Sequence, residues 1–221
     1  MGCRYAVGPC RRTVSAKLRS MTVGLDRDYG LDDDYEWARP PDGGWTADDL
    51  DRLPNLPSRT ELLDASLVFA SAQTMFHAST VRLLEGALVE QVPDVFEVYH
   101  FFSVTLDTRN RLEPDVLVSR AGADLGPRQT RLLPEDVTLV AEVVAEDSIG
   151  RDREAKPRKY AGAGIMHFWR VEEQDCLPVV YVYELDPATR TYVPTCIFHN
   201  RLKLTVPFLI DIDLTAVNRR R

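Results

Sequence analysis

The chain reads VTLVAEVV at residues 137–144 and DREAKPRKYAGAG at residues 152–164. The first stretch is almost continuously apolar, which is typical of a strand buried on both faces. The second predicts a helix that ends at the stop signals Gly162 and Gly164. Pro157 fits this helix best in its first turn, where a missing N–H matters least. A buried strand followed by a helix is therefore the expected centre of the fold.

Other apolar patterns surround this centre. Residues 75–92 carry apolar side chains at helical spacing and predict the longest helix. A shorter helix is expected from Thr46 to the prolines Pro54 and Pro57, with a turn at residues 61–64 after it. Strands are expected at residues 66–70, 97–104, 115–118, 165–172, 179–184, 192–198 and 202–207. This order predicts an α+β or α/β fold around one mixed sheet.

Composition limits the class of protein. The chain has 221 residues, 44% of them hydrophobic, which suits a packed core. Its apolar runs are shorter than the roughly 18 residues that a membrane helix needs, so we expect no membrane partner and a cytoplasmic location. The four cysteines are widely spaced, with no Cys-x-x-Cys pair and no His at zinc-finger spacing, as is ordinary for thiols in a reducing cytoplasm.

The two ends of the chain differ from its middle. Residues 1–20 hold five basic residues and no acid, and Met21 is the expected natural start; a basic arm that binds nucleic acid is the alternative. Residues 21–44 are rich in Asp, Pro and Gly. We expect an extended or disordered segment at residues 1–44, a folded domain at residues 45–215 and a tail at residues 216–221.

Net charge is −7, from 27 basic and 34 acidic residues. Without residues 1–20 it becomes −12, from 22 basic and the same 34 acidic residues. This excess of negative charge argues against a protein whose surface binds nucleic acid extensively, because phosphate contacts normally need a basic surface. It leaves room for an enzyme whose site is acidic until a metal ion binds.

Two carboxylates stand where apolar strands are expected. Glu142 lies inside one strand and Asp115 begins another. A buried carboxylate is costly unless it is paired or coordinates a metal ion. If the strands are neighbours, both side chains reach one site, and their hard oxygens suit Mg²⁺ or Mn²⁺.

A lysine follows on the next helix. Lys156 has Asp152 and Tyr160 four residues to either side, so the three share one helical face, while Lys159 on the adjacent flank is the competing candidate. Two carboxylates and a lysine are the smallest set of catalytic groups for metal-assisted phosphodiester hydrolysis. The structural alternative is a buried Glu142 satisfied by backbone hydrogen-bond donors and a solvated Lys156.

Several segments together resemble the PD-(D/E)XK nuclease superfamily and, more narrowly, its Uma-two family of restriction-type endonucleases. They are residues 60–68, His77, residues 113–118, residues 142–144 with residues 147–148, and residues 152–169. The resemblance covers about residues 45–215. It implies a restriction-endonuclease-like mixed sheet flanked by helices, and a nuclease-like domain at residues 45–215.

The resemblance also implies site residues. It makes Asp115 and Glu142 metal ligands and adds Glu61 to the metal shell, directly or through water. The superfamily's usual lysine position holds Val144 here, and the family pattern places that function on Lys156. His77 matches a frequent family histidine whose role stays open. Ala65 replaces a glycine usual in a turn, where a positive φ costs an alanine about 1 kcal/mol.

The expected activity is that of a Mg²⁺- or Mn²⁺-dependent DNA endonuclease, which a homodimer would serve by presenting two sites to two strands. Arg153, Arg158 and Lys159, together with Arg151, are candidates for phosphate contacts. A non-catalytic binding or scaffold protein on the nuclease fold stays open, because fold does not fix function. An RNA or nucleotide phosphodiesterase using the same site is the third alternative.

Overall fold

The computed structural model describes residues 39–219. The expected start at Met21, the basic segment and most of the acidic segment lie outside the described residues. Backbone contacts place a compact unit from Pro40 onward, and it alone is described below. The domain boundaries expected from the sequence stay predictions.

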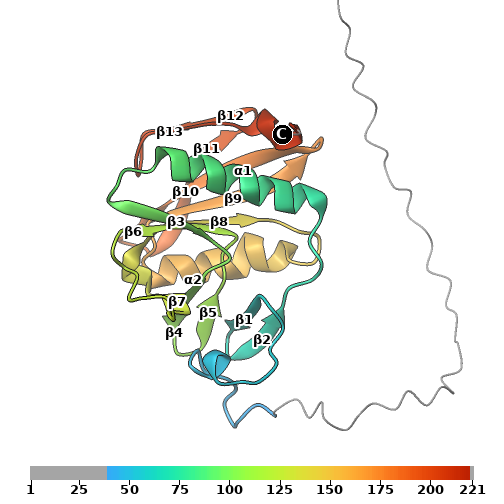
Figure 1. Cartoon of the computed structure of the whole chain (residues 1–221), viewed down its shortest axis with the longest axis vertical. Helices are drawn as coiled ribbons and strands as arrows, with labels where there is room; N and C mark the ends of the chain where they lie inside the picture. Colours follow the sequence, from blue (N-terminus) through green and yellow to red (C-terminus); the bar gives the residue numbers. More distant parts are fainter. Residues whose placement is uncertain (1–38, 220–221) are drawn as a thin grey trace, which may run out of the picture. The chain divides into compact units, whose positions relative to one another are not determined.

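A six-stranded mixed sheet forms the centre of this unit, in the order β11-β10-β9-β8-β6-β3 (Figure 1). Its strands are β3 (Phe96–His100), β6 (Val116–Arg120), β8 (Val137–Val143), β9 (His167–Gln174), β10 (Leu177–Asp186) and β11 (Thr191–Phe198). Only β8 and β9 pair in parallel within this sheet; the other neighbours are antiparallel. The expected mixed sheet is therefore present, with the expected apolar strand β8 at its centre.

The parallel pair exists because a helical crossover joins β8 to β9. It consists of the π-helical turn η3 (Arg151–Ala155) and the helix α2 (Lys156–Ala163), which ends at Gly164 with a left-handed φ of 90°. Pro157 stands in the first turn of α2. The sequence prediction for this segment is confirmed, except that its first turn is π-helical.

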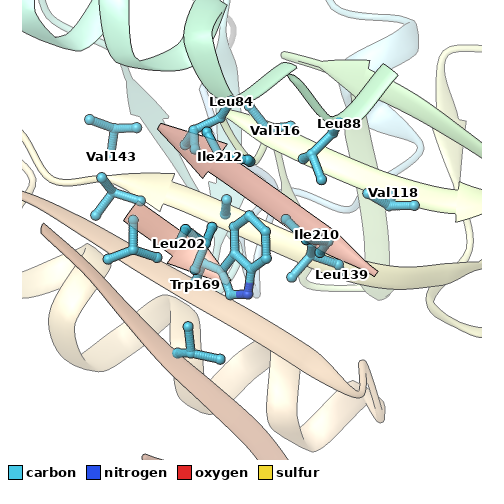
Figure 2. Close-up of a cluster of buried hydrophobic side chains, with 14 of the residues drawn as sticks. Leu84, Leu88, Val116, Val118, Leu139, Val143, Trp169, Leu202, Ile210 and Ile212 are labelled. Carbon is cyan, nitrogen blue, oxygen red and sulfur yellow. The ribbon is translucent and has the colours of Figure 1, made fainter. Parts of the chain in front are cut away.

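Helices cover both faces of the sheet. The helix α1 (Met75–Gln91) packs on one face together with the hairpin of β12 (Arg201–Leu204) and β13 (Ile210–Asp213), while α2 lies on the other face (Figure 1). Trp169 is fully buried under α1 and this hairpin, beside Leu202 and Ile210 (Figure 2). Neighbouring β8 residues alternate between the two cores, because side chains alternate across a strand.

A second sheet, in the order β2-β1-β5-β4-β7, lies beside the first. Its strands are β1 (Thr60–Leu63), β2 (Ser66–Phe69), β4 (Ser103–Asp107), β5 (Asn110–Leu112) and β7 (Arg131–Leu132). Ala65 in the β1–β2 turn has a φ of 65°, so the positive φ anticipated at this position is confirmed. The other helical elements of the described residues are short 3-10 turns: η1 (Asp49–Asp51), η2 (Pro134–Asp136) and η4 (Leu214–Asn218).

Three local predictions are wrong. The helix expected from Thr46 is only the turn η1: the carboxylate of Asp49 accepts from the N–H and the hydroxyl of Thr46, as at a helix start, but Pro54 follows too closely for a helix to extend. Residues 61–63 belong to the strand β1, and only Asp64 lies in the turn that follows it. The strand expected at residues 97–104 breaks at Phe101, whose φ is 49°, and its halves join different sheets.

No helix within residues 39–219 is both long and apolar enough to cross a membrane.

Candidate active site

The predicted carboxylates lie on adjacent strands. Val116 of β6 pairs with Ala141 of β8, so Asp115, just before β6, lies beside the end of β8 that carries Glu142. Glu142 faces α2, since its strand neighbours point into the opposite core. Asp115 is 3% exposed and Glu142 is 2% exposed. The sheet thus brings two buried carboxylates to one pocket.

Lys156 lies among the carboxylates. Its Nζ is 3.0 Å from Oε1 of Glu61, 3.1 Å from Oε2 of Glu142 and 3.5 Å from Oδ1 of Asp152. The hydroxyl of Tyr160 donates to Oε1 of Glu142 at 2.6 Å. The shared helical face of Asp152, Lys156 and Tyr160 therefore points at Glu142, and the alternative of a solvated Lys156 is wrong.

Asp115 is held by three donors. Its Oδ1 accepts from Nη2 of Arg59 at 2.7 Å, and its Oδ2 accepts from the Val143 N–H at 2.8 Å. Nε2 of His77 lies 3.1 Å from the same Oδ2. His77 is 3% exposed and comes from the third residue of α1, so the helix brings it onto a carboxylate and not merely into apolar packing.

Arg59 is the residue that sequence reasoning missed. Besides Asp115 it approaches Oε1 of Glu113, with its Nε at 3.4 Å, and its guanidinium lies 3.8 Å from the centroid of the Phe101 ring. The only local signal was its place directly before β1. Spacing gave no hint, because 56 residues separate Arg59 from Asp115.

Glu61 joins the cluster through β1. Its Oε1 accepts from the Glu113 N–H at 2.8 Å as well as contacting Lys156. The β1 strand belongs to the second sheet, so the site combines side chains from both sheets. The expected place of Glu61 near Asp115 and Glu142 agrees with this arrangement.

Burial and neighbouring charges shift the pKa values of several groups in the cluster. Burial would raise the pKa of Asp115, but the hydrogen bond and charge of His77, with Lys156 and Arg59, hold that pKa below its usual value. Burial raises the pKa of Glu142 well above its usual value, and although Lys156 opposes this, the other carboxylates add to it. Burial acts to lower the pKa of Lys156, but the surrounding carboxylates raise it well above its usual value.

The pocket has an excess of negative charge. Six carboxylates line it (Glu61, Glu113, Asp115, Glu142, Asp147, Asp152) against three cations (Arg59, Arg151, Lys156), a formal net of −3 before His77 is counted. It encloses a cavity of about 40 Å³, room for a water or an ion. Two buried oxygens, Oε1 of Glu113 and Oδ1 of Asp152, accept no hydrogen bond. Hard oxygens in excess of cations are the donor chemistry that Mg²⁺ and Mn²⁺ prefer.

Within residues 39–219, no three His, Cys, Asp or Glu side chains are arranged to hold a metal ion as they stand. Lys156 contacts three of the candidate oxygens and so fills space between them. The donor set therefore fits a divalent cation in chemistry, and the lysine would have to shift to admit it.

Three predicted residues lie away from this pocket. Lys159 pairs with Asp64 at the β1–β2 turn. Arg153 donates to Glu172 of β9 at 2.7 Å, and Arg158 is a largely exposed side chain near Glu154. None of the three lines the pocket, whereas Lys156 does.

The chain has relatives among known proteins. The sequence matches a family profile, Uma2, whose description is "Putative restriction endonuclease", over residues 47–216. The fold is similar to the crystal structure of "a putative nuclease belonging to DUF820" from Anabaena variabilis ATCC 29413, with a TM-score of 0.60 and 13% identity, over 78% of this chain and 96% of that one. At this identity the likeness shows the fold alone. No curated protein sequence matches the chain.

Proposed function

Because the family match spans residues 47–216, the chain belongs to the Uma2 family, and we propose that it is a divalent-metal-dependent nuclease that hydrolyses phosphodiester bonds of DNA. One observation carries the proposal. Buried carboxylates from two sheets surround the ammonium of Lys156 in a pocket that also contains Asp115. Such a concentration of buried charge is expensive in a purely structural role and is typical of a functional site.

Asp115 and Glu142 would hold the metal ion, with Glu61 as a further ligand directly or through water. Bound there, Mg²⁺ or Mn²⁺ supplies a more acidic water and neutralises charge on the phosphate. Asp115 keeps its orientation through Arg59 and the Val143 N–H. Carboxylate oxygens have lone pairs beyond those already engaged, so these contacts do not prevent coordination.

Lys156 and Tyr160 supply donors rather than ligands. Lys156, released from part of its carboxylate contacts, donates a hydrogen bond to the attacking water or to a phosphate oxygen that gains charge. Tyr160 donates to Glu142 and fixes the orientation of that carboxylate. Both residues belong to α2, so this helix is the rigid support of the site.

The test is cleavage of linear and supercoiled DNA with Mg²⁺ or Mn²⁺, comparing the wild type with Glu142→Gln and Asp115→Asn. Glu146→Gln is the matched control, because Glu146 is an exposed carboxylate four residues after Glu142. We expect cleavage to be lost in the first two variants and kept in the control. Cleavage by Glu142→Gln at the wild-type rate would refute the site.

Calorimetric Mn²⁺ binding by the same variants separates the alternatives. Binding that is lost in both site variants, together with cleavage of RNA but not DNA, would favour an RNA phosphodiesterase. A folded wild type that neither binds Mn²⁺ nor cuts would favour the scaffold alternative. The homodimer and the cytoplasmic location stay predictions, the first open to light scattering after size-exclusion chromatography.

A further inference from the structure

A second pocket, of about 420 Å³, lies against a different flank of α2. We call it the outer pocket and define it by Arg153, Arg158, Arg170, Arg190, Tyr183 and Tyr192. Its residues come from the η3–α2 segment, from β9, β10 and β11, and from the β10–β11 turn, which carries Arg190; the strands contribute from the sheet face that α2 covers. None of them lines the candidate active site.

The outer pocket is basic in an acidic chain. Its four arginines face two nearby carboxylates, Glu154 in the lining and Glu172 at its edge, a net of +2 in a chain of net charge −7. Glu172 accepts from Arg153 at 2.7 Å and lies 2.8 Å from Nε of Arg170, so one carboxylate serves two guanidinium groups. Arg158 is only loosely paired, 3.7 Å from Glu154. Uncompensated positive charge gathered here favours an anion.

Planar groups line the same pocket. The guanidinium of Arg170 lies 5.5 Å from the centroid of the Tyr183 ring. Phe168 packs against the rings of Tyr183 and Tyr192, at centroid distances of 5.6 and 5.3 Å. Stacked aromatic and guanidinium planes bind unpaired nucleobases, and nearby arginines bind the phosphates between them.

The outer pocket and the candidate active site share one wall. Asp152 and Lys156 line the active site, whereas their neighbours Arg153 and Pro157 line the outer pocket. A strand that crosses the first turn of α2 would therefore touch both. A base still paired in a duplex cannot reach a stacking surface without leaving its partner, so the ligand that fits is single-stranded.

We propose that the outer pocket binds a nucleotide of a single-stranded nucleic acid segment that flanks the phosphate held in the active site. The proposal rests on the proposed function for the class of ligand. It predicts that the enzyme holds its substrate next to an unpaired segment, such as an end, a gap or a melted stretch.

The test is fluorescence anisotropy with a labelled single-stranded oligonucleotide of about 15 nucleotides and with its duplex, in EDTA so that no cleavage occurs. The double variant Arg158→Glu/Arg190→Glu reverses two exposed charges of the outer pocket. The matched control, Arg82→Glu/Arg128→Glu, reverses two exposed charges elsewhere. We expect affinity to fall about tenfold or more beyond the control, and the salt slope to shrink by about 0.7 for each phosphate that the variant no longer binds.

A second variant tests stacking separately. Tyr183→Leu keeps an apolar contact with Phe168 but removes the planar ring. It should weaken binding of the oligonucleotide several-fold and leave binding of inorganic polyphosphate unchanged. Circular dichroism and thermal melting show whether each variant is folded.

Failure of this proposal and failure of the proposed function give different results. Equal losses in the outer-pocket and control variants, or a wild type that prefers the duplex, would overturn the outer pocket while leaving metal-dependent cleavage untouched. Binding that depends on the outer pocket in a protein that never cuts DNA would uphold the pocket and refute the nuclease.

Discussion

Nζ of Lys156 lies 3.1 Å from Oε2 of Glu142, and the two side chains are 8% and 2% exposed. This buried ion pair has two opposite effects. It stabilises a pocket that would otherwise concentrate unpaired carboxylates, because an isolated buried charge is costly. It also places a positive charge where a metal ion would have to enter.

The first prediction concerns that competition. Lys156→Met should raise Mn²⁺ affinity by about tenfold, because the carboxylates lose a competing cation, and should lower cleavage by about 10² or more, because a donor is lost. Without metal the variant should unfold more easily by about 3 kcal/mol, since breaking a buried pair leaves uncompensated charge. Calorimetry and thermal melting in EDTA and in Mn²⁺ measure both effects.

Lys159→Met is the control for Lys156→Met. Lys159 is three residues further along the same helix but pairs with Asp64 outside the pocket. Its replacement should leave metal affinity and cleavage near wild type. Weaker Mn²⁺ binding by Lys156→Met than by the wild type would contradict the idea that this lysine competes with the metal ion.

The second prediction concerns Arg59. Its replacement by Met removes a charged hydrogen bond from the buried Asp115 and the contact with the Phe101 ring. We expect a loss of about 1–3 kcal/mol in the free energy of unfolding, measured with urea. Arg52→Met, an exposed arginine in the preceding turn, should change it by less than about 0.5 kcal/mol. A similar loss in both variants would argue against a specific role of Arg59.

The parts of the site that could be predicted from the sequence depend on local patterns. Continuous apolar residues predict the strand at Val137–Val143, and a glycine after the last helical turn predicts where the following helix ends. Spacing of four residues places Asp152, Lys156 and Tyr160 on one face. The prediction chose Lys156 over Lys159 because of the family resemblance. In the structure Lys156 contacts Glu142 in the pocket, whereas Lys159 pairs with Asp64 outside it.

The parts that escaped prediction depend on contacts between distant segments. Arg59 meets Asp115 only because a second sheet brings β1 against the first. The break at Phe101 is invisible in an alternating run of apolar residues, since it reflects the transfer of the chain from one sheet to the other. Such events are decided by tertiary packing, which overrides local propensity.

The third prediction concerns two adjacent glycines before β1. Gly43 and Gly44 have φ values of 94° and 86°, so alanine is strained at both. A Cβ on Gly43 would meet nothing within 4 Å, whereas one on Gly44 would lie 2.6 Å from the carbonyl oxygen of Ala65. Gly43→Ala should cost about 1 kcal/mol and Gly44→Ala about 2–3 kcal/mol, by urea unfolding. Equal costs would mean that the contact with the β1–β2 turn is looser than the structure has it.

The fourth prediction concerns pH. Oδ1 of Asp51 accepts from Nη1 of the buried Arg111 at 2.8 Å, and Oδ2 accepts from Arg131 at 2.7 Å. Partial burial acts to raise the pKa of Asp51, but hydrogen bonds and the two arginines bring it below its usual value. A carboxyl whose pKa is lower in the folded state stabilises the protein above its unfolded pKa of about 4 and loses that effect as pH falls through the folded value.

Asp51→Asn should therefore destabilise the protein at pH 7 and much less at pH 3. Because the side chain of Asp51 is about one-third exposed, solvent screening limits the effect at pH 7 to about 1 kcal/mol. Urea unfolding of the wild type and the variant at pH 7, 5 and 3 measures the difference. Asp94→Asn, at an exposed position just before β3, should show little difference at any of these pH values. A gap between wild type and Asp51→Asn that stays constant down to pH 3 would show that the side chain acts through packing or neutral hydrogen bonds and not through its charge.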